Sequence, residues 1–120
     1  MALTIVDIVP VSIDAQQINA TVETIYTSPA SEGSTKINSL YVTNDTTTSD
    51  QITLYNVPNG GSAGVTNIIA IAVTIPGDGM PVWFATENTP IWVEASGTIQ
   101  AIADTADQFT IQGGGLEYKI

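Results

Sequence analysis

The chain shows no window with a helical period, and turn-forming residues interrupt it throughout; this pattern constrains its fold more than any other feature. Pro, Gly and Asn recur at intervals of roughly 8 to 14 residues, a spacing typical of β-sandwiches and barrels. The segments between them are rich in Ile, Val, Thr and Tyr, which pack well on a pleated sheet. We expect strands at residues 3–9, 21–27, 35–44, 50–57, 67–75, 82–85, 91–95, 98–103 and 108–112, a last short segment at 116–120, and an irregular stretch at 10–19.

Side chains alternate between the two faces of a strand, so the expected strands can be divided into an inner and an outer face. In the longest apolar run, Ile69, Ile71, Val73 and Ile75 are expected to share one face, opposite two small alanines. About eight or nine such strands predict an all-β fold, an antiparallel β-sandwich of jelly-roll or immunoglobulin-like topology, with a closed barrel as the alternative. We expect residues 1–20 to form an N-terminal strand or arm and residues 21–120 to form the sandwich domain.

The charge balance limits the partners of the chain. Twelve acidic residues face only two basic ones, Lys36 and Lys119, which gives a net charge of −10 over 120 residues. No basic stripe is available to bind phosphates, so nucleic acid and anionic membranes are not expected as partners. A cationic patch on another protein is the natural complement of this charge. Alternatively, the acids only keep the protein soluble.

The residues that usually carry catalysis are missing. Without His or Cys, the chain cannot build a serine–histidine triad, a thiolate nucleophile or a histidine metal site. The acids sit mostly at expected turns, where capping of the backbone explains them. Calcium ligands could come from the loop of Asn44, Asp45 and Asp50 or from the turn of Asp104 and Asp107, although neither matches an EF-hand loop. We therefore expect no enzyme, no cofactor and no metal site.

The N-terminus lacks the basic start of a signal peptide, and the longest apolar run is too short to cross a bilayer. We expect a protein that is made in a cytoplasm and is soluble there.

The aromatic residues are the strongest candidates for a contact surface. Trp83 and Trp92 each lie between two apolar neighbours, so both indoles are expected to point away from the core. Tyr41 and Tyr55 are expected on outer faces as well. Tryptophan is enriched at interface hot spots, which favours contact between subunits. Burial in the core, through a shift of one residue in register, and a platform for carbohydrate stacking are the alternatives.

Both ends of the chain suggest assembly. Leu3 and Ile5 belong to a segment that is apolar on both faces, as expected for a strand that pairs with a partner. Leu116 and Tyr118 follow three consecutive glycines, which we expect to act as a hinge before the last segment. Such arms can add a strand to the open edge of a neighbouring sheet. The alternative is that both segments are ordinary edge strands.

The order of these elements resembles that of small virion proteins of tailed bacteriophages. The elements that carry the resemblance are the Ile-Tyr-Thr-Ser-Pro segment at 25–29, the strand at 37–44, the hairpin at 52–60 and the segment at 91–101. The resemblance covers residues 21–118, and the N-terminal twenty residues depart from the family pattern. It implies a β-sandwich that decorates a capsid or sits on a head or tail fibre, often as a trimer. It brings no catalytic residues.

Together, these observations lead to the hypothesis of a capsid decoration (cement) protein. It would form a homo-oligomer, a trimer by resemblance, bind the major capsid protein and reside on the virion surface after synthesis in the host cytoplasm. The alternative hypothesis is a phage tail or fibre module that binds a host-surface glycan, or another virion protein, through the face of Trp83 and Trp92.

Overall fold

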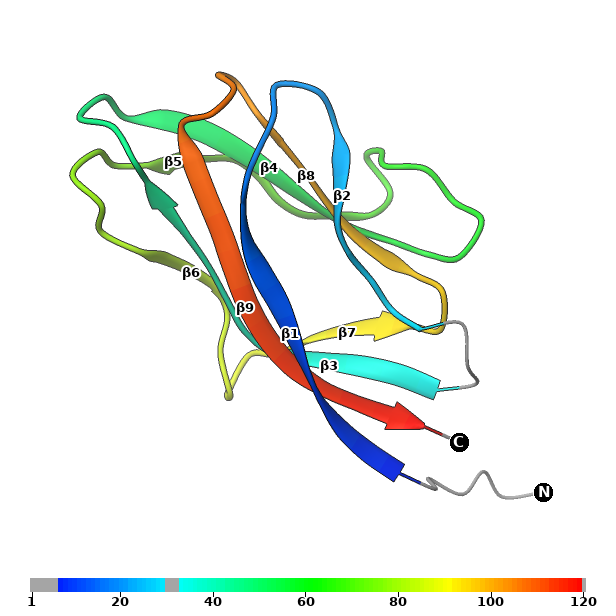
Figure 1. Ribbon diagram of the computed structural model, residues 1–120. Helices are drawn as coiled ribbons and strands as arrows, with labels where there is room; N and C mark the ends of the chain where they lie inside the picture. The colour runs from blue at the N-terminus through cyan, green and yellow to red at the C-terminus, as the bar shows by residue number, and fades with distance from the viewer. Residues whose placement is uncertain (1–6, 30–32, 120) are drawn as a thin grey trace.

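The computed structural model describes residues 7–29 and 33–119, and all regular structure within these ranges is β-strand (Figure 1). The strands are β1 (Asp7–Gln17), β2 (Glu23–Thr27), β3 (Gly33–Asn44), β4 (Asp50–Val57), β5 (Ile68–Ile75), β6 (Val82–Ala85), β7 (Ile91–Glu94), β8 (Thr98–Ala103) and β9 (Phe109–Lys119). None of the described residues belongs to a helix that is long and apolar enough to cross a membrane.

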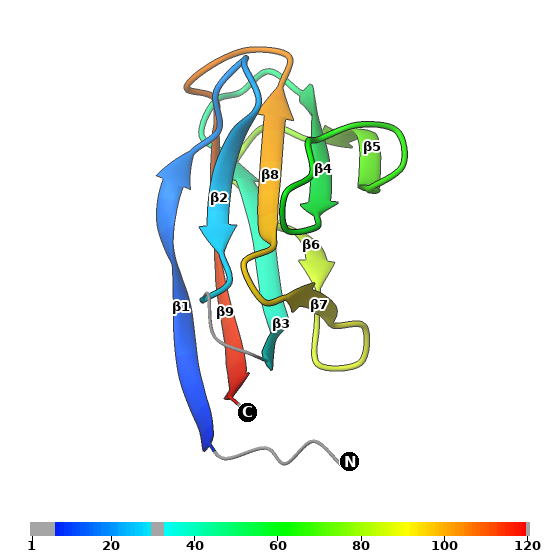
Figure 2. The same ribbon diagram turned by 90° about the vertical axis from the view of Figure 1, so that its right-hand side faces the viewer.

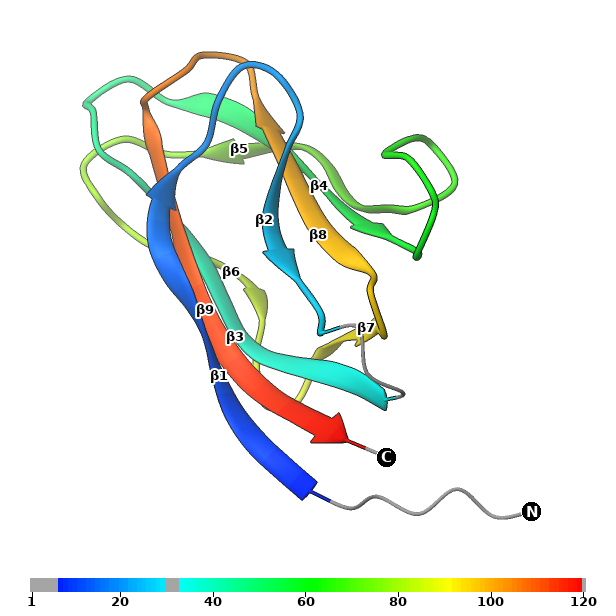
Figure 3. The same cartoon turned by 45° about the vertical axis from the view of Figure 1, so that its right-hand side comes forward.

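The strands form two antiparallel sheets that pack face to face (Figures 2 and 3). One sheet has the order β1-β9-β3-β6, with β7 also paired to β3, and the other has the order β2-β8-β4-β5. Because β6 and β7 pair with different parts of β3, they share the position of one strand. The pairs are therefore nested, first strand with last and second with the one before last, as in a long hairpin rolled into a jelly roll. The predicted β-sandwich is confirmed.

The core fills the space between the two sheets. Alternate residues of the central strands point inward and are fully buried, as the two-residue period of a strand requires. Burial of each large side chain stabilises the fold by about 1.5–3 kcal/mol. The largest fully buried side chains are Phe109, Ile18, Ile37, Leu40, Ile52, Leu54, Ile75, Ile99 and Ile111.

The first strand differs from the expectation. A strand was expected at residues 3–9 with an irregular stretch after it, whereas β1 runs from Asp7 to Gln17 and includes Pro10. Proline is compatible with this position because β1 is an edge strand, so its missing N–H faces no further partner. Within the expected N-terminal strand or arm, residues 1–20, the segment Asp7–Gln17 thus forms one edge of the sandwich itself.

The expected glycine hinge is also wrong, because β9 continues through Gly113–Gly115 as one strand between β1 and β3. A side chain at Gly113 would collide with the carbonyl group of Ser39, and one at Gly115 with the carbonyl oxygen of Lys36. The pairing of β3 with β9 shifts register between Ile37 and Ser39, beside these glycines. The glycines therefore allow close approach of two backbones at a β-bulge instead of flexibility.

The alternation expected for the longest apolar run fails at one residue. Ile75 is buried, and Ile69 and Val73 pack against the core, but Ile71 is 67% exposed. The cause is a register shift between β4 and β5, together with a left-handed backbone at Ala72 (φ 46°). An irregularity of this kind turns a side chain to the opposite face, and the hydrophobic pattern alone does not reveal it.

Candidate interaction surface

The outer face of the β1-β9-β3-β6 sheet carries both tryptophans. Trp83 on β6 is 53% exposed and Trp92 on β7 is 51% exposed. Their neighbours Val82, Phe84 and Val93 pack into or against the core. Both indoles therefore point away from the core, which is the orientation that strand alternation predicts.

Cross-strand register brings further residues to this face beside Trp92. Directly opposed residues of antiparallel strands point to the same side of a sheet, so the pairing defines rows of side chains. One row across β7, β3, β9 and β1 consists of Trp92, Lys36, Leu116 and Pro10, and the adjacent row consists of Glu94, Ser34, Tyr118 and Ile8. We call these two rows the aromatic patch. It unites the predicted contact residues Trp92, Leu116 and Tyr118.

Within the aromatic patch, two aromatic rings and one cation are in contact. The ring centroids of Trp92 and Tyr118 are 5.5 Å apart with an angle of 40° between the ring planes. The Nζ atom of Lys36 lies 5.9 Å from the centroid of the Trp92 ring. Tilted aromatic pairs contribute about 0.5–1.5 kcal/mol beyond their buried area, and exposed cation–π contacts about 0.5–1 kcal/mol. The indole is therefore held in place before any partner binds.

A second aromatic pair lies further along the same face. Tyr41 of β3 and Trp83 of β6 are register partners, and their ring centroids are 4.6 Å apart with an interplanar angle of 40°. At a rise of about 3.3 Å per residue, the path along β3 from Lys36 to Tyr41 is about 17 Å. The face thus presents two separate Trp–Tyr pairs.

Tyr55, another predicted contact residue, is not part of this face. Tyr55 lies on β4 in the other sheet, where it pairs with Ile68 and Gln100, and its strand neighbour Leu54 is buried. Tyr55 therefore faces outward on the opposite side of the sandwich. Leu3 and Ile5 lie outside the described residues.

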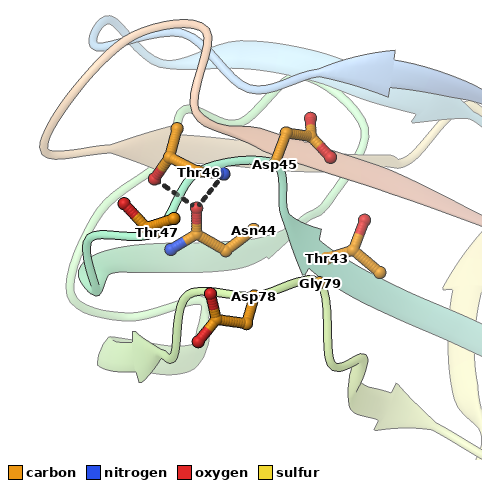
Figure 4. A pocket seen from close by; sticks show the side chains of 7 residues that line it. All are labelled: Thr43, Asn44, Asp45, Thr46, Thr47, Asp78 and Gly79. Atoms are coloured by element: carbon orange, nitrogen blue, oxygen red, sulfur yellow. Dashed lines mark hydrogen bonds between the residues drawn. The ribbon is translucent and has the colours of Figure 1, made fainter.

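A hollow of about 460 Å³ lies between the β3–β4 loop and the β5–β6 loop. Its lining residues are Thr43, Asn44, Asp45, Thr46, Thr47, Asp78 and Gly79 (Figure 4). The side-chain oxygen of Asn44 accepts hydrogen bonds from the backbone N–H (2.9 Å) and hydroxyl (2.8 Å) of Thr46, while its amide nitrogen donates to the carbonyl oxygens of Thr48 (2.8 Å) and Ile75 (3.2 Å). Both the oxygen and the nitrogen of the Asn44 amide are thus engaged in hydrogen bonds within and beside the loop.

The hollow does not assemble the calcium ligands considered from the sequence. The carboxylates of Asp45 and Asp78 point away from each other in Figure 4. One oxygen of Asp45 accepts a hydrogen bond of 2.6 Å from the hydroxyl of Thr110. Residues 7–29 and 33–119 contain no group of three or more His, Cys, Asp or Glu side chains placed to hold a metal ion.

A buried polar cluster inside the sandwich was not predicted from the sequence. The hydroxyl of Thr35 shares hydrogen bonds with Tyr26 (3.1 Å) and with Ser28 (2.9 Å). Burial raises the pKa of Tyr26, the hydrogen bond with Thr35 partly offsets this, and the charge of Glu117 raises the pKa further. Tyr26 lies on β2 and Ser28 directly follows it, whereas Thr35 on β3 and Glu117 on β9 belong to the other sheet. Only the packing of the two sheets brings these residues together.

No protein-family model matches the chain, and no curated protein matches its sequence. Among solved structures, it is similar to a chain of Bacillus endospore appendages, reported as a novel family of disulfide-linked pili. The TM-score is 0.57 at 17% identity, over 100% of this chain and 96% of the other. It is also similar to a chain in the structure of infectious bursal disease virus, Gt strain, with a TM-score of 0.50 at 12% identity.

The viral match covers 92% of this chain but 32% of the viral chain, so the present chain spans about a third of that protein. At such identities, the likeness shows a common fold. The present chain contains no cysteine, so disulfide links between its copies cannot form.

Proposed function

We propose that the protein is a structural protein of a virion surface, a capsid decoration protein whose copies associate with one another and bind the outer shell. The observation that carries this proposal is the presence of two Trp–Tyr pairs on one outer sheet face, each with a tryptophan about half exposed. Tryptophan and tyrosine are enriched at interface hot spots, which favours contact with a partner. Covering the exposed half of each indole contributes on the order of 2 kcal/mol.

The charge distribution supports a cationic particle surface as the second partner. Asp45, Asp78, Asp104 and Asp107 lie in the loops at the end of the sandwich where β3 ends and β9 begins. Lys119 lies at the other end of the sandwich, where it is the register partner of Asp7 in the pairing of β1 with β9. A positive shell surface would attract the acidic loops and leave the aromatic face available to neighbouring copies.

The structural neighbours support the same class of function. One comes from a pilus and the other from a virus, so the jelly roll of this chain also occurs in proteins reported from large assemblies. Binding that occurs only on an assembled shell stabilises that shell by mass action, which is the mechanism proposed for decoration. The three-fold symmetry implied by the bacteriophage resemblance remains a prediction.

Co-sedimentation with capsids that lack the protein tests the proposal. We expect the protein to pellet with the shells, to raise their temperature of disruption, and to bind less tightly as salt screens its negative charge. If the protein does not pellet with the shells but binds an immobilised host glycan, the result would contradict the decoration hypothesis and favour the tail-fibre alternative.

A further inference from the structure

We infer that the aromatic patch is a two-fold contact between two copies of this chain, in which Lys36 of each copy pairs with Glu94 of the other around a central Trp92. This inference rests on the proposed self-association and specifies its surface and symmetry. It assigns two-fold symmetry to this face and leaves the three-fold association implied by the resemblance as a separate prediction.

The argument begins with the positions of four residues on two neighbouring strands. Trp92 and Glu94 lie on β7, and their register partners Lys36 and Ser34 lie on β3. Strands are about 4.8 Å apart, and two residues span about 6.7 Å along a strand, so the four positions form a nearly rectangular cell. Lys36 and Glu94 occupy one diagonal of this cell, and Trp92 and Ser34 occupy the other.

A two-fold axis can lie in the plane of the interface, along the diagonal from Trp92 to Ser34. Rotation about this axis brings the Lys36 corner of one copy onto the Glu94 corner of the other. Lys36 of one copy then faces Glu94 of the second copy, and the reciprocal pair forms on the other side of the axis. Trp92 meets its own counterpart on the axis, where the small Ser34 leaves room for large rings. The strands of the two copies cross at roughly 70°, close to the orthogonal class of sheet packing.

Charge complementarity favours a second copy over other partners. The chain has a net charge of −10 and only two lysines, yet one of them lies in the aromatic patch, with its Nζ atom 5.9 Å from the Trp92 ring centroid. The patch therefore carries one cation and one anion, Lys36 and Glu94, among apolar and neutral side chains. A cationic partner would be repelled by Lys36 and an acidic one by Glu94, whereas the patch is complementary to itself.

Apolar side chains flank the cell on the same outer face. Leu116 and Tyr118 on β9 and Pro10 and Ile8 on β1 continue both rows, and Ile8 is 51% exposed. Aromatic residues in the centre with charged pairs beside them match the usual anatomy of a protein interface. Added salt screens the repulsion between two copies of charge −10, so we expect dimerisation to strengthen with salt, in contrast to binding to a cationic shell.

Sedimentation equilibrium of charge-reversal variants tests the contact. We expect the wild type to reach twice its chain mass of 12.6 kDa as the concentration rises. Lys36→Glu and Glu94→Lys should each weaken dimerisation by about tenfold or more, because each places like charges opposite one another. The double variant should recover to within about threefold of the wild type. Lys119→Glu is the matched control for Lys36→Glu, because it changes the net charge by the same amount, and it should leave dimerisation unchanged.

Crosslinking provides a second measurement that leaves the charges intact. Because the chain has no native cysteine, Ser34→Cys introduces a single thiol beside the axis. A short bis-maleimide should link two copies of this variant, but not of Ser12→Cys, whose residue is opposite Gly114 on β1 and β9. A double charge variant no better than the single ones, or equal crosslinking of both cysteine variants, would overturn the two-fold contact.

The outcomes also separate this inference from the proposed function. An oligomer that is insensitive to substitutions at Lys36, Glu94 and Trp92 would overturn the two-fold contact and leave self-association through another surface. A monomer at all concentrations that still pellets with capsids would overturn the contact and self-association but retain shell binding.

Discussion

Trp92 of β7 and Tyr118 of β9 meet diagonally across the intervening strand β3, with ring centroids 5.5 Å apart. The strands β7 and β9 both pair with β3, where Lys36 is the register partner of Trp92 and Ser34 is that of Tyr118. The contact links the last strand of the chain to β7 across the sheet face. It gives the aromatic patch a fixed shape before a second copy arrives.

The Tyr41–Trp83 pair should be coupled energetically but contribute little to folding overall. We expect Trp83→Ala to lower the free energy of unfolding by about 1 kcal/mol, since the indole is half exposed. A double-mutant cycle with Tyr41→Ala should give a coupling energy of about 0.5–1.5 kcal/mol, measured by urea denaturation. Strictly additive effects of the two substitutions would show that the rings do not interact in solution.

The glycines of β9 should be intolerant of any side chain. We expect Gly113→Ala and Gly115→Ala each to destabilise the protein by about 1–3 kcal/mol or more, because a Cβ would collide with backbone atoms of β3. Gly64→Ala is the control, since its Cβ would meet only the carbonyl oxygen of Ser62 at 4.0 Å. Thermal unfolding measures the difference, and equal melting temperatures for all three variants would restore the hinge interpretation.

Asn44 should be a key residue of the β3–β4 loop. It is 1% exposed, and its amide makes four hydrogen bonds, so Asn44→Ala removes all four at a buried position. We expect a loss of about 2–3 kcal/mol in the free energy of unfolding. Asn67→Ala, in the more exposed loop before β5, removes two loop hydrogen bonds and should cost less. Chemical denaturation of both variants checks this order.

Tyr26 should make the fold sensitive to alkali. Burial, opposed by the hydrogen bond with Thr35 and aided by the charge of Glu117, raises its pKa above the ordinary value of 10.0. In the unfolded chain the phenol loses its proton near that ordinary value, while the folded state still holds it. The stabilisation is therefore complete below about pH 10 and is lost as the pH rises through the raised pKa.

The measurement is the free energy of unfolding as a function of pH for the wild type and for Tyr26→Phe. We expect a shallower alkaline decline in the variant, which lacks the titrating group. An identical decline in both proteins would mean that other groups cause the alkaline sensitivity.

Local sequence features predicted much of the fold. The expected strands at 50–57, 82–85 and 98–103 coincide with β4, β6 and β8, because turn residues bound them and their side chains alternate. Alternation also placed Trp83 and Trp92 on the outer face. These features depend only on neighbours in the sequence, where a two-residue period is informative.

The errors arose where pairing between distant strands decides the structure. Pro10 reads as a strand breaker until β1 is known to be an edge strand, and Gly113–Gly115 read as a hinge until β3 is seen against them. Likewise, the two rows of the aromatic patch depend on the register of β1, β3, β7 and β9. A single sequence does not specify which strands become neighbours, so Tyr118 could not be placed beside Trp92.

Tryptophan fluorescence during association tests the central claim most directly, because Trp92 is about half exposed in the centre of the proposed contact. The second tryptophan, Trp83, lies outside the aromatic patch. Emission and iodide quenching would be followed across a concentration series whose association state is known from sedimentation. We predict that the emission shifts to shorter wavelength and that quenching decreases as copies associate, with Trp92→Ala abolishing both changes. Association with unchanged emission and quenching, or no association at any concentration, would contradict the account.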